Sequence, residues 1–144
     1  MAAGLLQRDY PGWQVSSAGL AAPVGAAADP RAVRMLAREG CDIGRHRART
    51  VDATLLAAAD VVLVMEARQR DTLEEMYPEA RGKTYRLCEF MDADVPDPYG
   101  CSQKMFELVL ELIRQGIASW APQLEAHGRT ERQGAENESH TYPR

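Results

Sequence analysis

An aspartate between two prolines is the side chain in this sequence best suited to chemistry. Asp97 follows Pro96 and precedes Pro98, and Tyr99 stands two positions further on. Proline fixes φ near −65° and restricts the residue before it, so Asp97 has little backbone freedom left to lose on folding. A carboxyl group held in this way can meet a leaving group repeatedly in one geometry, as a general acid must. The same dipeptides are also common in turns, so this segment alone leaves a plain turn open.

The length and charge of the chain limit the functions in which Asp97 could take part. With 144 residues, of which 45% are hydrophobic, the chain is one domain that can bury a core. A net charge of −4 argues against a dedicated nucleic-acid binder, which is usually basic. No apolar run reaches the length of a membrane span and no signal peptide is recognisable, so we expect a cytoplasmic protein without a membrane partner.

Cysteine and histidine do not form a recognisable metal or disulfide pattern. The three cysteines, Cys41, Cys88 and Cys101, are an odd number and include no CxxC pair. The histidines are scattered along the chain, so we predict no metal site.

Alternating strands and helices are predicted to position the candidate residues. Helical patterns cover 1–10, 29–40, 52–59 and 68–76, and a long final helix contains 106–120; strand patterns cover 13–17, 61–65 and 83–87. The continuous apolar run 61–65 is typical of a strand buried on both faces of a parallel sheet. This order predicts a layered α/β domain over 1–124. Residues 125–144 are polar and poor in aliphatic side chains, so we predict a disordered tail there.

Five tracts of the sequence resemble the low-molecular-weight protein-tyrosine-phosphatase family, bacterial members included, in order and spacing. They are Val15–Gly19, Ala28–Ala32, Gly40 through His46–Arg49, Asp60 through Glu66, and Asp97–Gly100. The resemblance extends over roughly residues 1–120. It implies a flavodoxin-like doubly wound parallel sheet with helices on both faces.

The resemblance also implies an activity and roles for particular residues. The family hydrolyses phosphotyrosine in proteins, or an aryl phosphate, through a cysteinyl-phosphate intermediate and without a cofactor. Asp97 would be the general acid and base, and Tyr99 would line the entrance where the substrate ring stacks. Ser17 and His46 would hydrogen-bond the phosphate-binding loop from behind.

The family's decisive motif has no counterpart at the expected place. That motif is Cys-x5-Arg followed by Ser or Thr, between the first strand and the first helix, and residues 1–6 resemble what comes directly after it. We therefore expect the first, central strand and its loop to be missing from this chain, and the chain as it stands to be inactive. Three interpretations remain: a truncated phosphatase, a catalytically dead binding or regulatory relative, and a thiol-dependent arsenate reductase of the same fold.

The spacing Cys-x5-Arg does occur between Cys41 and Arg47, but there it follows a helix instead of a buried strand. A phosphate loop leaves a buried strand and enters a helix, whereas Cys41 follows a helix closed by Gly40. We expect Cys41 to be a small buried apolar residue. The basic run from Arg45 to Arg49 could contact phosphate or nucleic acid, although such clusters are more often solvated.

Overall fold

The computed structural model describes residues 1–132 and 139–143, and side chains as far as Ala126. In chain order the elements are α1 (Ala2–Asp9), β1 (Gln14–Ala18), α2 (Pro30–Ala37), α3 (Ala53–Ala58), β2 (Ala59–Val64), α4 (Ala67–Met76), η1 (Pro78–Ala80), β3 (Thr84–Arg86), η2 (Glu89–Met91), α5 (Gln103–Arg132) and β4 (Ser139–Pro143). The predicted alternation of helices and strands is confirmed for each predicted element, with boundaries shifted by a few residues.

Local sequence signals explain where several helices begin. The side chain of Asp29 accepts a hydrogen bond from the amide of Arg31 at 2.8 Å, and Pro30 occupies the first position of α2. Asp52 caps α3 in the same way, by accepting from the amide of Leu55 at 2.8 Å. These caps satisfy backbone donors that the first helical turn leaves without partners.

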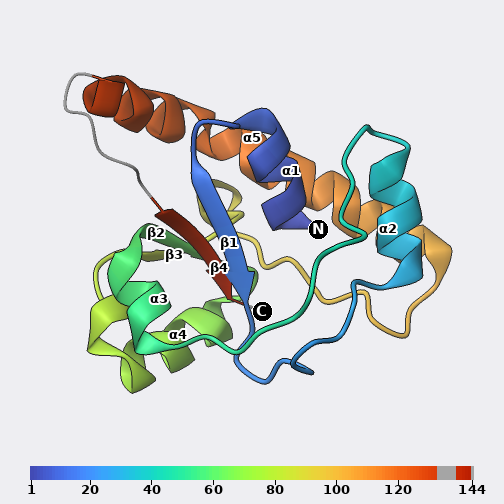
Figure 1. Cartoon of the computed structure of the whole chain (residues 1–144), viewed down its shortest axis with the longest axis horizontal. Helices are drawn as coiled ribbons and strands as arrows, with labels where there is room; N and C mark the ends of the chain where they lie inside the picture. Colours follow the sequence, from blue (N-terminus) through green and yellow to red (C-terminus); the bar gives the residue numbers. More distant parts are fainter. Residues whose placement is uncertain (133–138, 144) are drawn as a thin grey trace.

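The sheet is entirely parallel, in the order β1-β4-β2-β3. Its position between β1 and β2 is occupied by β4, the last described segment of the chain (Figure 1). Ser17 of β1 stands opposite Tyr142, and Val62 of β2 stands opposite Thr141. The segment nearest the C-terminus therefore supplies an inner strand of the sheet.

This arrangement differs from the expectation of a disordered tail over 125–144. α5 continues past that boundary to Arg132, and β4 follows it, while residues 133–138 and 144 lie outside the described part of the chain. Composition indicated disorder because the segment is polar, but a parallel strand needs mainly backbone donors and acceptors on its two neighbours.

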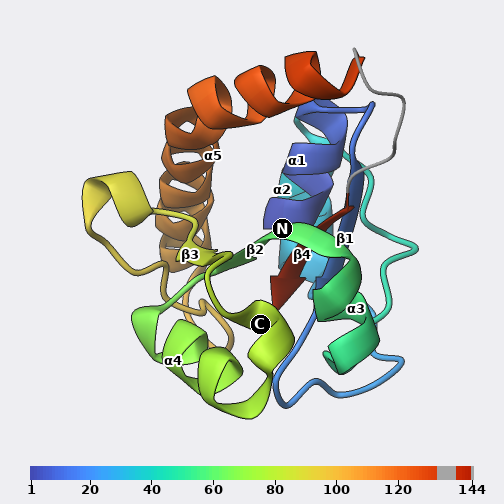
Figure 2. The ribbon, with the colours of Figure 1, turned by 90° about the vertical axis from the view of Figure 1, so that its left-hand side faces the viewer.

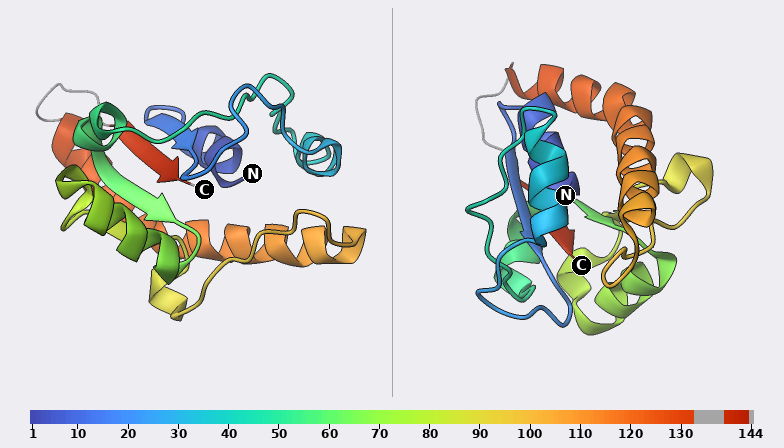
Figure 3. Two further views of the ribbon diagram at one scale, coloured as in Figure 1. Left: turned by 90° about the horizontal axis from the view of Figure 1, so that it is seen from below. Right: turned by 90° about the vertical axis from the view of Figure 1, so that its right-hand side faces the viewer.

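Helices cover both faces of the sheet, as the resemblance implied (Figures 2 and 3). Leu63 of β2 belongs to a core that includes side chains of α1, α2 and α5. Its neighbours Val62 and Val64 belong to a second core, with Leu56 of α3 and Leu73 of α4. The alternation of strand side chains between the two faces thus makes both cores from one apolar run.

The long helix α5 bends in its second half, as Figure 2 shows. Pro122 lies inside this helix and cannot donate the usual backbone hydrogen bond, which is a common cause of a kink. Two residues before Pro122, the indole Nε1 of Trp120 donates to the carbonyl of Leu87 at 2.8 Å. This buried contact fixes α5 against the segment that leads from β3 toward Asp97.

Candidate active site

The Asp97 loop, residues 95–102, follows η2 in the chain, contacts the end of β2 and leads into α5. The amide of Val95 donates to the carbonyl of Met65, which directly follows β2, at 2.8 Å. The Val95 side chain is almost fully buried, with 1% of its surface exposed. One end of the loop is therefore fastened both to the sheet and to the core.

A tight turn presents the Asp97 carboxylate. Its Oδ1 accepts a hydrogen bond from the amide of Tyr99 at 3.0 Å, and the amide of Cys101 donates to the carbonyl of Pro98 at 2.9 Å. Gly100 has φ of +74°, in the left-handed region that glycine adopts without strain. The chain therefore turns sharply while Asp97, which is exposed, keeps one carboxylate oxygen engaged by the loop itself.

The other end of the loop is fastened to the start of α2. The guanidinium of Arg31 donates to the carbonyl of Cys101 and lies over the ring of Phe106, 4.1 Å from its centroid. Nε of Arg31 also lies 3.5 Å from Oδ1 of Asp29, the residue that caps α2. Sequence reasoning did not single out Arg31 for this role, although the residue falls within one of the tracts that carry the resemblance.

Ser17 and Asp97 both belong to the carboxyl side of the sheet. β1, β4 and β2 run parallel, so their carboxyl ends share one edge, and the register pairs Ala18 with Pro143 at the end of β1. Ser17 is the last residue but one of β1 and is half-buried. In open α/β sheets, ligands bind in the crevice outside the carboxyl ends of the strands.

His46 lies on a segment that is joined to the chain leaving β1. The segment 41–51 pairs with 19–27 through backbone hydrogen bonds, from Gly19 to Arg49, from Ala48 to Ala26, and from Val51 to Gly19, at 2.8, 2.8 and 2.9 Å. His46 is half-buried there, and its amide donates to the carbonyl of Ile43 at 3.1 Å. The strand that carries Ser17 is thus continuous with the loop that fixes the His46 segment.

Tyr99 projects from the Asp97 loop, with 81% of its surface exposed. The ring therefore does not cover the apolar core. An exposed ring beside the candidate acid is available to contact another molecule.

The expectation that Cys41 is a buried apolar residue is confirmed. Cys41 follows α2, is only 6% exposed, and belongs to the same core as Leu5 and Leu6 of α1. Burial raises the pKa of its thiol, and the nearby Arg8 opposes this shift without overcoming it. A nucleophilic cysteine needs a lowered pKa, so the environment of Cys41 is unsuited to that role.

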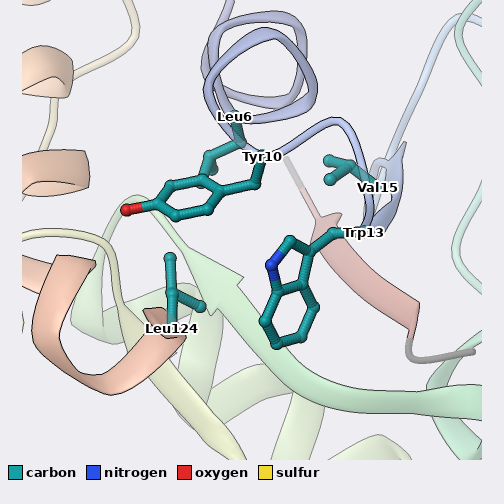
Figure 4. A pocket seen from close by; sticks show the side chains of 5 residues that line it. All are labelled: Leu6, Tyr10, Trp13, Val15 and Leu124. Atoms are coloured by element: carbon teal, nitrogen blue, oxygen red, sulfur yellow. The ribbon is translucent and has the colours of Figure 1, made fainter. Parts of the chain in front are cut away.

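A separate apolar recess lies at the other end of the molecule's first strand. Leu6 and Tyr10 from α1, Trp13 and Val15 around the start of β1, and Leu124 of α5 line it (Figure 4). Burial raises the pKa of the Tyr10 hydroxyl, and the charges of Glu125 and Asp9 add to that effect. The recess therefore offers neither a nucleophile nor a charged group to a substrate.

The described residues contain no group of three or more His, Cys, Asp or Glu side chains arranged to hold a metal ion. None of their helices combines the length and apolar character that crossing a bilayer requires.

Comparison with known proteins places these features in a family. Residues 1–130 match the low molecular weight phosphotyrosine protein phosphatases. The chain is 39% identical over 128 residues to EpsP of Ralstonia nicotianae, a probable low molecular weight protein-tyrosine-phosphatase, and the match covers 89% of this chain and 88% of that protein.

Solved structures agree with the sequence match. A protein tyrosine phosphatase superposes with a TM-score of 0.82 at 38% identity, over 87% of this chain and 86% of that one. Wzb of Vibrio vulnificus, solved in complex with benzylphosphonate, superposes with a TM-score of 0.80 at 31% identity, over 85% and 87%. The fold is accordingly flavodoxin-like, and the chain belongs to the low molecular weight phosphotyrosine protein phosphatase family.

Proposed function

We propose that this protein is a phosphotyrosine phosphatase whose chemistry requires a Cys-x5-Arg loop outside these 144 residues. A thiolate in such a loop attacks the phosphorus of an aryl phosphate, and the bond to the phenolic oxygen breaks. Asp97 donates its proton to that oxygen, and the carboxylate then takes a proton from the water that hydrolyses the cysteinyl phosphate. The thiolate leaves and is restored.

Tyr99, Ser17 and His46 complete the proposal. The exposed Tyr99 ring stacks against the aromatic ring of the substrate. Ser17 and His46 act as positioning residues that hydrogen-bond the phosphate-binding loop.

The proposed substrates are phosphotyrosine proteins rather than nucleic acids. All three cysteines are free thiols, which supports a reducing compartment such as the cytoplasm.

The observation that carries the proposal is the way in which the Asp97 loop is held. Backbone and side-chain contacts fasten it at Val95 and at Cys101, so the carboxylate is presented from a fixed turn at the carboxyl side of the sheet. The relative solved with benzylphosphonate supports a phosphorylated aromatic ligand for this chain.

The test compares the 144-residue chain with a form extended upstream by an apolar strand and a Cys-x5-Arg-Ser loop. We expect turnover of an aryl phosphate by the extended form only. Cys41→Ser serves as the matched control and should leave that turnover unchanged, because Cys41 is buried beside α1.

Three outcomes would contradict the proposal. Turnover by the 144-residue chain that disappears in Cys41→Ser would make Cys41 the nucleophile. An extended form that binds a phosphotyrosine peptide without hydrolysing it would be a binding module. An extended form that reduces arsenate with added thiol, but leaves aryl phosphates intact, would be a reductase.

A further inference from the structure

Three arginines, Arg45, Arg47 and Arg49, form what we call the arginine strip, on the segment that is paired with the chain leaving β1. The strip lies along the candidate site: Nε of Arg49 donates to the carbonyl of Ser17 at 3.1 Å. Arg47 pairs through its backbone with Ala27, which belongs to the connection leading to α2 and Arg31. We propose that the arginine strip binds acidic residues that flank the phosphotyrosine of the substrate.

Among the side chains that the structure describes, no carboxylate is paired with an arginine of the strip. All three side chains are exposed, and the contacts that the structure gives them within its described part are to backbone carbonyls. Arg47 donates to the carbonyls of Gly44 and His46, at 3.2 and 2.7 Å. The guanidinium groups keep further donors for an incoming carboxylate, which they can engage in bidentate fashion.

Two other arginines of the described structure are used differently. Arg86 is bonded to Glu89, Asp92 and Asp94, and Arg114 to Glu39 and Glu111. Those guanidinium groups are paired with carboxylates of the fold, so they attract an external anion only weakly. The strip resembles neither network, and its three arginines gather within five residues next to Ser17. This clustering beside the candidate site favours a role toward an external anion over a structural one.

The sign of the charge and the shape of the segment indicate the kind of partner. The net charge of the whole chain is −4. A local cluster of cations on such a chain attracts anions to that one place on the surface. Arg47 and Arg49 are two positions apart, and the residue between them is less exposed, as in an extended segment with alternating side chains. An extended acidic peptide matches this spacing.

This inference rests on the proposed function, because it takes the substrate to carry a phosphotyrosine that lies beside the strip. The peptide contacts themselves can be measured on the 144-residue chain without any turnover. A labelled, unphosphorylated peptide with Glu and Asp around a central Tyr is compared with a matched peptide that carries Gln and Asn instead. Binding is followed by fluorescence anisotropy at about 0.01 M and about 0.15 M salt.

We expect the chain to prefer the acidic peptide and the preference to shrink at the higher salt concentration. The double variant Arg45→Gln with Arg47→Gln should weaken binding of the acidic peptide about fivefold to tenfold at low salt, given the usual strength of exposed ion pairs. The matched control is Arg34→Gln with Arg38→Gln, which removes the same charge from exposed positions of α2 and the residue after it. That control should retain the preference.

A rescue variant separates charge from loop structure. Arg45→Lys with Arg47→Lys keeps both charges, so it should retain most of the preference for the acidic peptide even if the carbonyl contacts of Arg47 are lost. Failure of this rescue, or an equal loss in the α2 control, would overturn the proposal. A single-stranded oligonucleotide that binds as tightly as the acidic peptide would overturn it too, because the strip would then be a general polyanion site.

The proposed function and this inference can fail separately. If the extended form proves inactive on aryl phosphates while the acidic preference persists, the strip stands and the phosphatase assignment falls. If the extended form hydrolyses neutral and acidic phosphotyrosine peptides with equal kcat/KM, the phosphatase assignment stands and the strip has no role in substrate choice.

Discussion

The amide of Val95 lies 2.8 Å from the carbonyl oxygen of Met65 and donates a hydrogen bond to it. This bond joins the end of the sheet's apolar strand to the loop that presents Asp97, two residues further along the chain. The end of β2 therefore helps to fix the position of Asp97. A rigid element that holds a reacting group in one geometry is what general acid catalysis requires.

The first prediction concerns Asp97 in the form extended by the Cys-x5-Arg loop. Asp97→Asn should lower kcat on an aryl phosphate with a poor leaving group by roughly 10²–10⁴, because the phenolic oxygen then leaves without a proton. The effect should be much smaller for a good leaving group. Asp92→Asn is the control, since that side chain is exposed and precedes the loop. Equal rates for Asp97→Asn and the parent would remove Asp97 from the mechanism.

The second prediction concerns the close approach of α5 to the segment after β3. A Cβ at Gly116 would lie 2.8 Å from Cγ of Leu87 and 2.9 Å from Sγ of Cys88, whereas a Cβ at Gly12 meets nothing within 4 Å. Alanine normally favours a helix by about 1 kcal/mol over glycine, but overpacking costs about 1–3 kcal/mol.

Gly116→Ala should therefore lower the free energy of unfolding, by about 1 kcal/mol at the middle of these ranges, in chemical denaturation. Gly12→Ala should change it little. A Gly116→Ala variant as stable as the parent would show that α5 can move away from Leu87 at little cost.

The third prediction concerns pH and the carboxylates around Arg86. A hydrogen bond from the amide of Ala67, together with the Arg86 guanidinium, holds the pKa of Asp94 below its usual value despite some desolvation. Desolvation acts to raise the pKa of Glu89, but the bonds from the amide and side chain of Arg86 outweigh it, and that pKa is lowered too.

A lowered pKa in the folded state gives stability that is present above the unfolded value, about 4, and is lost as pH falls through the folded value. Arg86→Met should reduce stability at neutral pH by about 1 kcal/mol, because its partners are partly exposed. Its unfolding free energy should also fall less between pH 6 and about pH 3 than that of the parent. Parallel pH profiles for the two proteins would contradict this account.

The fourth prediction concerns β4. Deleting residues 139–144 removes the strand that pairs with both β1 and β2, and each lost backbone hydrogen bond contributes about 0.5–1.5 kcal/mol. The melting temperature should therefore fall markedly, and the exposed strand edges should promote aggregation.

Proline scanning provides a matched pair for this test. Thr141→Pro removes a backbone donor in the middle of β4, where the residue stands opposite both Ser16 and Val62. Ser139→Pro changes the first residue of the strand, where proline is tolerated better. We expect Thr141→Pro to lower the melting temperature more. Equal melting temperatures for both variants and the parent would show that β4 contributes little to the stability of the sheet.

Much of the fold follows from local patterns in the sequence. The apolar run at 61–65 predicted a strand buried on both faces because only such a strand has no polar side, and the structure divides Leu63 and its neighbours Val62 and Val64 between two cores. The helical patterns that start at 29 and 52 predicted where α2 and α3 begin, and in the structure the carboxylates of Asp29 and Asp52 bond the first free amides there. The stiff backbone around Asp97 was predictable because proline restricts φ locally.

Other features depended on contacts between distant parts of the chain, which no local pattern specifies. The polar composition of 125–144 predicted disorder, yet β4 lies between β1 and β2, because backbone groups of two separate strands provide its partners. The contact from Arg31 to Cys101 and the burial of Cys41 against α1 likewise arise from packing of segments far apart in sequence. The sequence by itself determined which side chains can react, whereas only the tertiary structure decided which of them are held, which are buried, and which strand occupies the middle of the sheet.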